Sequence, residues 1–320
     1  MKLAPTFRTL GAATRLLSSY SSSFRPHPSS SFSESPFQDI PTTSPIQRNI
    51  SGNVVITGGN RGIGFSLVST LLSKRPDTRI FAGVRDPNSS NLLEFKGDSR
   101  LTTLPLDLSS EESIESFANA VCENEAVQKI GINYIFNVAG ILNDDGMSGG
   151  RGGPERSVLA IDGGWMQKTL QINTIAPFLL IKNLAPSLQR PVPKRGDEGG
   201  AFPAPVIMNV SARVGSISDN NGLGGWYSYR ASKSALNQLT RTLAIEQARG
   251  GRWKRGGISV SFHPGTTETG LSEPFSKPLK NTSKLFPPHF VSGQMMDLAE
   301  KLTEENSGGL YAWDHKAIPF

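Results

Sequence analysis

Thr57-Gly58-Gly59-Asn60-Arg61-Gly62-Ile63-Gly64 joins a short apolar run, Val54–Thr57, to a helical pattern, Ile63–Lys74. A turn this tight needs residues that tolerate positive φ and a close approach of the backbone, which explains its glycines. The helix that follows directs its free N–H groups and the positive end of its dipole at the turn, where they favour an anion. Because the turn lies between a first strand and a first helix, it predicts a binding site for the pyrophosphate of a dinucleotide.

Outward from this turn, short apolar runs alternate with longer helical patterns, which predicts repeated βαβ units and a parallel sheet. Each strand candidate is apolar throughout, as expected where helices cover both faces of a sheet. The predicted strands are Val54–Thr57, Ile80–Val84, Leu101–Leu104, Ile132–Val138, Val206–Val210 and Ile258–His263. The predicted helices are Ile63–Lys74, Glu111–Asn124, Trp165–Leu188, Tyr227–Ala248 and Val291–Leu302. We therefore expect an α/β fold, a doubly wound parallel sheet (Rossmann fold), in a single domain over residues 49–320.

Four segments interrupt the alternation of strands and helices. Asn143–Pro154, Gln189–Pro205 and Gly250–Gly257 are rich in glycine, proline or charge and predict surface insertions. Pro264–Pro288, which follows the last core strand, is rich in Thr, Ser and Pro, and we expect it to form a mobile lid.

The first 48 residues differ in composition from the rest of the chain. They contain no acid before Glu34, are rich in serine and arginine, and lack the uninterrupted apolar block of a secretory signal. This composition predicts an organelle transit peptide, removed before about residue 50, and import into the mitochondrial matrix or, as the alternative, the chloroplast. A merely disordered tail is the other interpretation.

The overall composition argues against several classes of function. The formal net charge of +6 includes an excess of arginine in the first fifty residues, and Arg249, Arg252, Lys254 and Arg255 lie in a glycine-rich loop that we interpret as solvated. We therefore expect no nucleic-acid partner. The single cysteine, Cys122, excludes an internal disulfide and a cysteine-based metal cluster, and the histidines lack metal-ligand spacing. No stretch approaches the length of a membrane-spanning helix.

The spacing TGxxxGxG resembles that of the short-chain dehydrogenase/reductase family, and further motifs follow in the family's order. Asp107-Leu108 resembles its adenine-contacting pair, Asn137-Val138-Ala139-Gly140 its Asn-Asn-Ala-Gly signature with Val138 in place of the second asparagine, and Pro264-Gly265 its turn beside the nicotinamide. The resemblance covers Asn53 to Phe320. It implies cofactor contacts from Thr57, Gly58, Asn60, Arg61, Gly62, Ile63, Gly64, Asp107, Leu108, Asn137, Ala139, Gly140, Tyr229, Lys233, Pro264, Gly265, Thr267 and Thr269.

The end of the second predicted strand bears on which nicotinamide cofactor is used. An acid there binds the ribose diol of NAD(H) and repels a 2′-phosphate. This chain has neutral Val84 followed by Arg85, which can pair with a phosphate, and Arg61 in the glycine loop adds a second cation. We expect NADP(H). Asp86 keeps NAD(H) as the alternative, as the missing acid shifted by one residue.

Tyr229 and Lys233 lie four residues apart on a helical pattern, which places them on one helix face. A tyrosine has a pKa near 10, and we expect the nearby ammonium to favour its phenolate form. By resemblance to the family, Tyr229 is the proton donor to the carbonyl oxygen, Lys233 also binds the nicotinamide ribose, and Asn173 anchors a water that links the lysine to solvent.

The catalytic serine is the member of this group that departs from the family. Relatives end the fifth strand with Ser-Ser and use the second serine to polarise the substrate carbonyl, whereas strict alignment puts Ala212 at that position. We choose the adjacent Ser211 and keep Ser216 as the alternative. Loss of one such donor costs roughly 10²–10³ in rate, which would leave the enzyme slow but active.

The resemblance is most specific to the sniffer-like and C-factor-like carbonyl reductases, through Gly225-Trp226-Tyr227-Ser228-Tyr229-Arg230-Ala231-Ser232-Lys233. It implies an NADP(H)-dependent oxidoreductase that acts on an aldehyde, ketone or alcohol, with Trp226 and Tyr227 as candidate lining of the pocket. A non-catalytic protein that binds NADP(H) or a partner on the same scaffold is the alternative, favoured by the substituted serine. The family also implies that Trp165–Leu188 and Tyr227–Ala248 pair across a two-fold axis, in a homodimer or homotetramer.

Overall fold

The computed structural model describes residues 35–41, 49–88, 90–143, 154–188, 204–220, 224–250, 256–276, 280, 282 and 284–320. Most of the three predicted insertions, residues 144–153, 189–203 and 251–255, lies outside the described residues. The described body centres on an eight-stranded sheet of order β10-β9-β6-β5-β4-β1-β2-β3. All neighbouring strands of this sheet are parallel except β9 and β10. The predicted doubly wound sheet is confirmed.

The strand order reverses at β1, whose neighbours are β2 and β4. Ligands of doubly wound folds bind outside the carboxyl ends of the strands at such a switch point. The strands of the sheet are β1 (Gly52–Thr57), β2 (Thr78–Val84), β3 (Leu101–Pro105), β4 (Tyr134–Asn137), β5 (Val206–Val210), β6 (Ile258–His263), β9 (Leu310–Ala312) and β10 (Ala317–Ile318).

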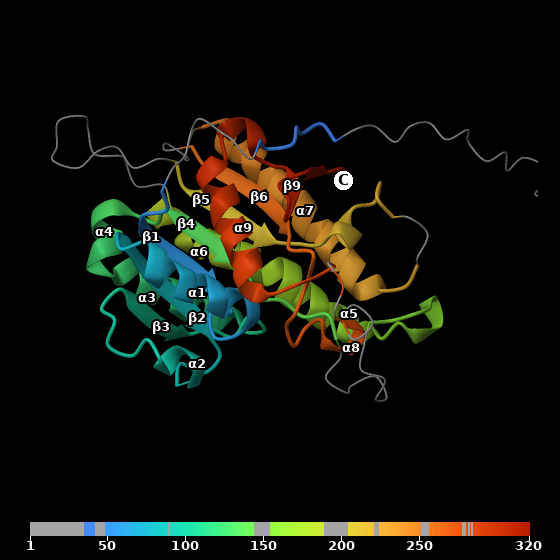
Figure 1. Ribbon diagram of the computed structural model, residues 1–320, viewed down its shortest axis with the longest axis horizontal. Helices are drawn as coiled ribbons and strands as arrows, with labels where there is room; N and C mark the ends of the chain where they lie inside the picture. Colours follow the sequence, from blue (N-terminus) through green and yellow to red (C-terminus); the bar gives the residue numbers. More distant parts are fainter. Residues whose placement is uncertain are drawn as a thin grey trace, which may run out of the picture. The chain divides into compact units, whose positions relative to one another are not determined.

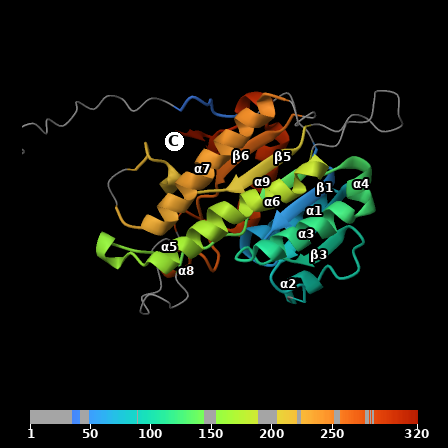
Figure 2. The same cartoon turned by 180° about the vertical axis from the view of Figure 1, so that it is seen from behind.

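Helices cover both faces of the sheet. Figure 1 shows α1 (Gly62–Lys74) and α9 (Pro288–Lys301) on one face, and Figure 2 shows α3 (Glu111–Glu123), α6 (Ala176–Leu188) and α7 (Tyr227–Ala248) on the other. Each face has its own buried apolar cluster, as a sheet covered on both sides requires. The shorter helices are α2 (Ser90–Leu93), α4 (Glu125–Ile130), α5 (Gly163–Leu170) and α8 (Glu273–Ser276), with the 3₁₀ turns η1 (Val158–Ala160), η3 (Arg213–Gly215) and η5 (Glu304–Asn306).

The predicted lid has regular structure of its own. β7 (Thr266–Thr267) pairs with β8 (Leu285–Phe286), and α8 lies between them in the chain. Gly265, at φ +69°, supports this arrangement, because a Cβ there would lie 2.7 Å from the ring of Phe286. Whether this segment moves stays a prediction.

The described body begins at Ser35, before the boundary that the sequence predicted at residue 49. Phe37 contacts the rings of Tyr311 and Phe320, with centroids 6.4 and 6.1 Å apart. Ile40 is 5% exposed within a core cluster, and its N–H donates to His315 O at 3.2 Å. Residues 35–41 therefore pack on the folded body, and where a transit peptide ends relative to them stays a prediction. The apolar content of this short segment is too low to distinguish it from its polar surroundings by sequence.

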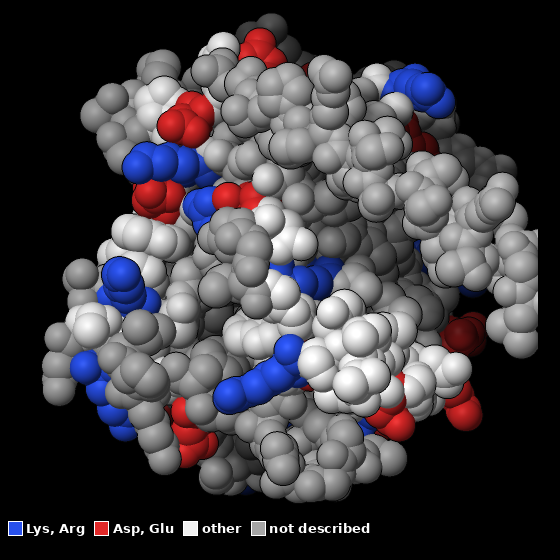
Figure 3. Space-filling model, turned by 90° about the vertical axis from the view of Figure 1, so that its right-hand side faces the viewer, with Lys and Arg blue, Asp and Glu red and all other residues white. Residues whose placement is uncertain are grey.

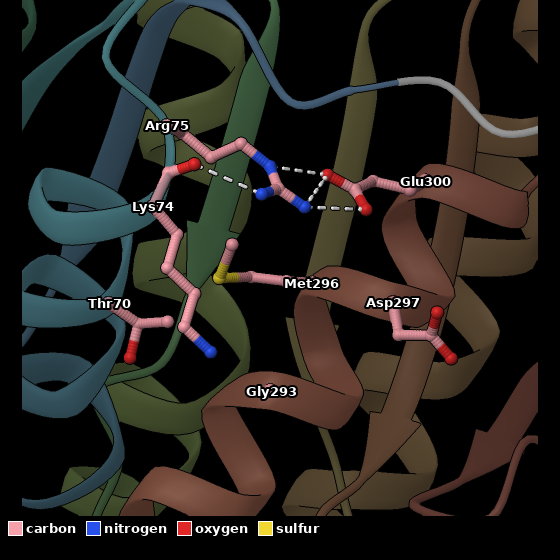
Figure 4. Close-up of a pocket in the computed structure, with 7 residues that line it drawn as sticks. All are labelled: Thr70, Lys74, Arg75, Gly293, Met296, Asp297 and Glu300. Atoms are coloured by element: carbon pink, nitrogen blue, oxygen red, sulfur yellow. Dashed lines mark hydrogen bonds and ion pairs between the residues drawn. The ribbon is translucent and has the colours of Figure 1, made fainter.

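An ion pair joins the two helices of the first face. Arg75, just after α1, donates to Glu300 of α9 at 2.8 and 2.9 Å, and Figure 4 shows the guanidinium reaching across the gap between the helices. Glu300 is 2% exposed and also accepts from Ile50 N–H at 3.0 Å. This carboxylate therefore fixes the chain where it enters β1, the strand that carries the glycine loop.

The described residues show neither a membrane-spanning helix nor a cluster of metal ligands. No helix among them is long and apolar enough to cross a membrane. They contain no group of three His, Cys, Asp or Glu side chains placed to hold a metal ion. On the face shown in Figure 3, lysine and arginine side chains stand among aspartate and glutamate.

Candidate active site

The glycine loop has the backbone that its sequence predicts. Gly58 and Gly62 have φ of +72° and +54°, a region that favours glycine. A Cβ at Gly64 would lie 2.3 Å from Gly58 O, so the first turn of α1 can approach the loop only with glycine there. The helix N-terminus and a close, bare backbone together form a cradle that fits a pyrophosphate.

The loop is joined to the two other cofactor motifs. Thr57 Oγ1 accepts from the N–H groups of Val138 and Ala139 at 3.0 and 3.1 Å, at the end of β4. A Cβ on Gly62 would lie 3.0 Å from Cγ2 of Thr269, so the segment after Pro264-Gly265 borders the loop. The structure thus brings the glycine loop, the Asn-Val-Ala-Gly segment and the Pro-Gly segment together at one edge of the sheet.

The end of β2 presents a cation, and the acid that follows it takes part in a local turn. Val84 is buried, whereas Arg85 and Arg61 are exposed on adjoining loops. Asp86 Oδ1 accepts from Asn88 N–H at 2.9 Å, a turn that its own carboxylate closes. Asp107 is held by hydrogen bonds from Ser109, which lower the pKa of its carboxyl, with a smaller contribution from Arg85.

Tyr229 and Lys233 lie one turn apart on α7, buried at 9% and 3% exposure. The lysine Nζ donates to Val210 O at 2.8 Å and lies 5.6 Å from the centroid of the tyrosine ring. The predicted placement of both residues on one helix face agrees with this geometry.

The first turn of α7 is held in an uncommon conformation. Trp226, its N-cap residue, has φ 59° and ψ 37°, and its N–H donates to Glu155 O at 2.5 Å. The Glu155 carboxylate is buried and accepts from Ser228 N–H at 3.3 Å and from the Ser228 hydroxyl. A non-glycine residue keeps a left-handed backbone conformation only where surrounding contacts hold it there. Such residues are often found at functional sites. The sequence did not predict a role for Glu155, because it lies far before Tyr229 in the chain and forms no local pattern with it.

Asn173 stands in a π-helical turn, η2 (Gln171–Ile175), between α5 and α6. Its amide accepts from Ile141 N–H and donates to Ile141 O, both at 2.8 Å, and donates to Ser232 Oγ at 3.1 Å. Gly140 completes the contact, since a Cβ there would lie 3.1 Å from Asn173 Oδ1 and 3.6 Å from Lys233 Nζ. Single π turns within helices are often found at functional sites. The structure therefore brings Gly140, Asn173 and Lys233 together.

The two serine candidates do not reach this group, which corrects the sequence-based choice. Ser211 is 1% exposed and its hydroxyl donates to Asn237 Oδ1 at 2.7 Å. Ser216 donates to Pro319 O, in the C-terminal segment. Ala212 instead packs with Tyr229 and Leu142 in one buried cluster. Strand alternation explains the error, because Ser211 points to the side of the sheet that α7 covers.

Two other residues predicted to contact the cofactor use their side chains within the protein. Asn137 is 3% exposed and donates to Asn209 Oδ1 at 2.8 Å, so its amide links β4 to β5. Thr267 is buried, and its hydroxyl donates to Pro264 O at 3.3 Å. Both side chains thus hold the motif together, and their contacts with a cofactor stay predictions.

Comparison with known proteins agrees with this geometry. The family described as short chain dehydrogenase matches residues 52–280 of the chain. The chain belongs to the short-chain dehydrogenase family. An uncharacterized oxidoreductase of Schizosaccharomyces pombe is 27% identical over 83% of this chain and 96% of its own length.

Two solved carbonyl reductases are similar to this short-chain dehydrogenase in sequence and in fold. The NADPH-bound carbonyl reductase from chicken fatty liver is 27% identical, with a TM-score of 0.72 over 88% of this chain and 98% of its own. The carbonyl reductase Sniffer of Drosophila melanogaster is 26% identical, with a TM-score of 0.70 over 85% of this chain and 100% of its own. The predicted family, the Rossmann fold and the likeness to sniffer-like carbonyl reductases are confirmed, and the chain is an oxidoreductase.

Burial sets the protonation of the two central residues of this short-chain dehydrogenase. It raises the pKa of Tyr229 above its ordinary value and lowers the pKa of Lys233 to about 7. Both shifts come from burial of the side chains, and the expectation that Lys233 and the oxidised nicotinamide favour the phenolate stays a prediction for the complex with cofactor. A tyrosine that keeps its proton is in the form that a proton donor requires.

Proposed function

We propose that this short-chain dehydrogenase transfers a hydride between NADP(H) and a small aldehyde, ketone or alcohol, with Tyr229 as the acid or base. The observation that supports the proposal most strongly is the buried group of Tyr229, Lys233, Asn173 and Gly140 beside the glycine loop. The NADPH-bound carbonyl reductase from chicken fatty liver supports the assignment of the cofactor, and both solved carbonyl reductases support the substrate class.

The residues of the site divide into binding and proton-transfer groups. The glycine loop and the N-terminus of α1 would hold the pyrophosphate, Arg61 and Arg85 a 2′-phosphate, and Asp107 and Leu108 the adenine. The nicotinamide, when bound, supplies the hydride in reduction or accepts it in oxidation. Tyr229 donates its hydroxyl proton to the carbonyl oxygen. Lys233 would bind the ribose and hold its ammonium proton near the Tyr229 phenol. Asn173 fixes Ile141 and Ser232, which neighbour these groups.

The test is turnover by the chain that begins at Ser35. It is mixed with NADPH and a panel of aldehydes, quinones and ketones, and the loss of absorbance of NADPH is followed. Tyr229→Phe should lower turnover by at least about 10², the usual contribution of general acid catalysis, and leave NADPH binding nearly intact. Turnover at the wild-type rate in Tyr229→Phe would overturn the assignment.

A non-catalytic NADP(H)-binding protein is the second candidate. One observation favours it, namely that Ala212 and not a hydroxyl packs against Tyr229. NADPH binding without turnover of any member of the panel would support this second function and contradict the first.

A further inference from the structure

Tyr229 packs in a small buried apolar cluster. Leu142 and Ala212 are buried with it, and the partly buried Val214, Trp226 and Leu271 pack against all three. The Trp226 ring meets the tyrosine ring edge-on, with centroids 6.2 Å apart.

Polar side chains close to the cluster in sequence are engaged elsewhere. Ser211, beside Ala212, donates to Asn237 on α7, and Ser216 donates to Pro319 O. Asn143, beside Leu142, donates one of its two amide N–H groups to Leu271 O at 2.9 Å, and its amide oxygen has no hydrogen-bond partner among the described residues. Among the described residues, neither serine near Ala212 therefore directs its hydroxyl at a substrate carbonyl within reach of Tyr229, and the position after Ser211 offers a methyl group instead.

We propose that the site selects its substrates by the electrophilicity of the carbonyl, with Ala212 as the residue that determines this selectivity. The proposal rests on the proposed function. In reduction the carbonyl carbon accepts a hydride, the π electrons of the C=O bond move to oxygen, and that oxygen takes the Tyr229 proton, while the nicotinamide is oxidised. Negative charge develops on oxygen as the hydride arrives, and a second donor would stabilise it. Without that donor, the substrate must spread the charge over its own electron-withdrawing groups.

Trp226, Leu142 and Leu271 narrow the class of substrate further. They offer aromatic and aliphatic surface around the phenol, which suits a carbonyl attached to an apolar or aromatic body. The preferred substrate is thus an apolar carbonyl compound whose C=O is conjugated with, or next to, an electron-withdrawing group.

The test is a series of para-substituted acetophenones reduced with NADPH, from methoxy to nitro, with kcat/KM measured for each. The wild-type protein should show a steep rise of log kcat/KM with the electron-withdrawing power of the substituent. Ala212→Ser should raise kcat/KM for the methoxy compound toward the roughly 10²-fold that one carbonyl donor contributes, and raise it less for the nitro compound. The slope of the series should therefore fall.

Ser211→Ala is the matched control, because it removes a hydroxyl one residue away that is bonded to Asn237. Its slope should equal that of the wild-type protein. The NADPH dissociation constant and the thermal unfolding temperature of Ala212→Ser establish that its cofactor site and fold are retained.

Each outcome decides for or against the proposal. A flat wild-type slope would overturn it without any variant, and so would an Ala212→Ser slope equal to the wild-type slope. Turnover of the series with either of these results leaves the proposed function in place. NADPH binding without turnover of any acetophenone, aldehyde or quinone would overturn both the proposed function and this inference.

Discussion

Two side chains at the end of β2 carry the proposed preference for NADP(H). Arg85 is exposed beside the glycine loop, while Val84 is buried and Asp86 closes its own turn. Val84→Asp combined with Arg85→Ala should shift the ratio of kcat/KM values from NADPH toward NADH, because an acid then faces the 2′-phosphate. Steady-state kinetics with both cofactors measure the shift. A wild-type protein that already prefers NADH would show that Asp86 binds the ribose.

The burial of Lys233 should make stability depend on pH. Its pKa is about 7 in the folded protein, against 10.5 when solvated, so between these values the unfolded chain binds the extra proton. The free energy of unfolding should therefore rise as pH rises from 7 toward 10, relative to Lys233→Met, which lacks the titrating group. Urea titrations of both proteins at several pH values measure the difference. Parallel pH profiles would mean that the ammonium stays solvated in the folded protein.

At the scale of single residues, the sequence predicted which residues lie near the active site better than it predicted the directions of their side chains. Tyr229 and Lys233 share a helix face, and helical periodicity alone predicts that. Ser211 was misassigned because one position along an extended strand reverses the direction of a side chain. The bonds of Ser211 to Asn237 and of Asn137 to Asn209 depend on tertiary partners that no local pattern specifies.

At the scale of elements, apolar periodicity predicted the bounds of β5, β6 and α7 as the structure has them. The single helix predicted over Trp165–Leu188 is instead α5, the π turn η2 and α6. A π turn adds one residue to a single turn, and one such shift of phase is too local for apolar periodicity to separate one helix from three elements. β9 and β10 were missed because strands of two or three residues are shorter than the period-two pattern needs.

Glu155 connects the loop before η1 to the first turn of α7. We predict that Glu155→Ala lowers the free energy of unfolding by about 1–2 kcal/mol, the value of a lost helix cap, and also lowers kcat, since Tyr229 follows Ser228 directly. Glu155→Gln, which keeps one acceptor oxygen, should be milder in both measurements.

Asn124→Ala is the matched control for Glu155. Asn124 caps α4 by accepting from Ala126 N–H at 3.1 Å and takes no part in the site. It should cost a similar free energy of unfolding with kcat close to that of the wild-type protein. An equal fall of kcat in the Glu155 and Asn124 variants would reduce Glu155 to a structural cap.

At the scale of the whole molecule, η2 and α7 present apolar side chains to solvent. Ile175 and Ile245 are 43% and 40% exposed, on the helices for which the sequence predicted pairing between two copies. We retain the homodimer as a proposal, since an isologous contact would cover both residues. Light scattering at micromolar concentration should give twice the mass of one chain, and Ile175→Glu should halve it. A single-chain mass for the fully active wild-type protein would contradict the dimer.

The packing of residues 35–41 limits where a transit peptide can end without loss of stability. Asp39 Oδ1 accepts from Ala317 N–H at 2.8 Å, and Arg241 of α7 lies 4.9 Å from the Phe37 ring, so this segment holds the C-terminal strand against the helix that carries Tyr229. We propose that any organelle import signal lies before Ser35. A chain beginning at Asn49 should be less stable than one beginning at Ser35 by at least about 2 kcal/mol, the value of one buried isoleucine such as Ile40.

Urea unfolding of the two truncated chains measures this difference, and Phe37→Ala in the longer chain separates the contribution of the ring from that of the backbone bonds. Phe320 O accepts from Ser218 N–H at 3.0 Å, in the loop between η3 and α7, so loss of the segment should loosen that loop as well. Reduction by the chain beginning at Asn49 should accordingly show a raised KM for the carbonyl substrate. Equal stability and equal KM for the two chains would mean that residues 35–41 contribute nothing to the folded enzyme. Removal of a transit peptide near residue 48 would then leave the enzyme intact.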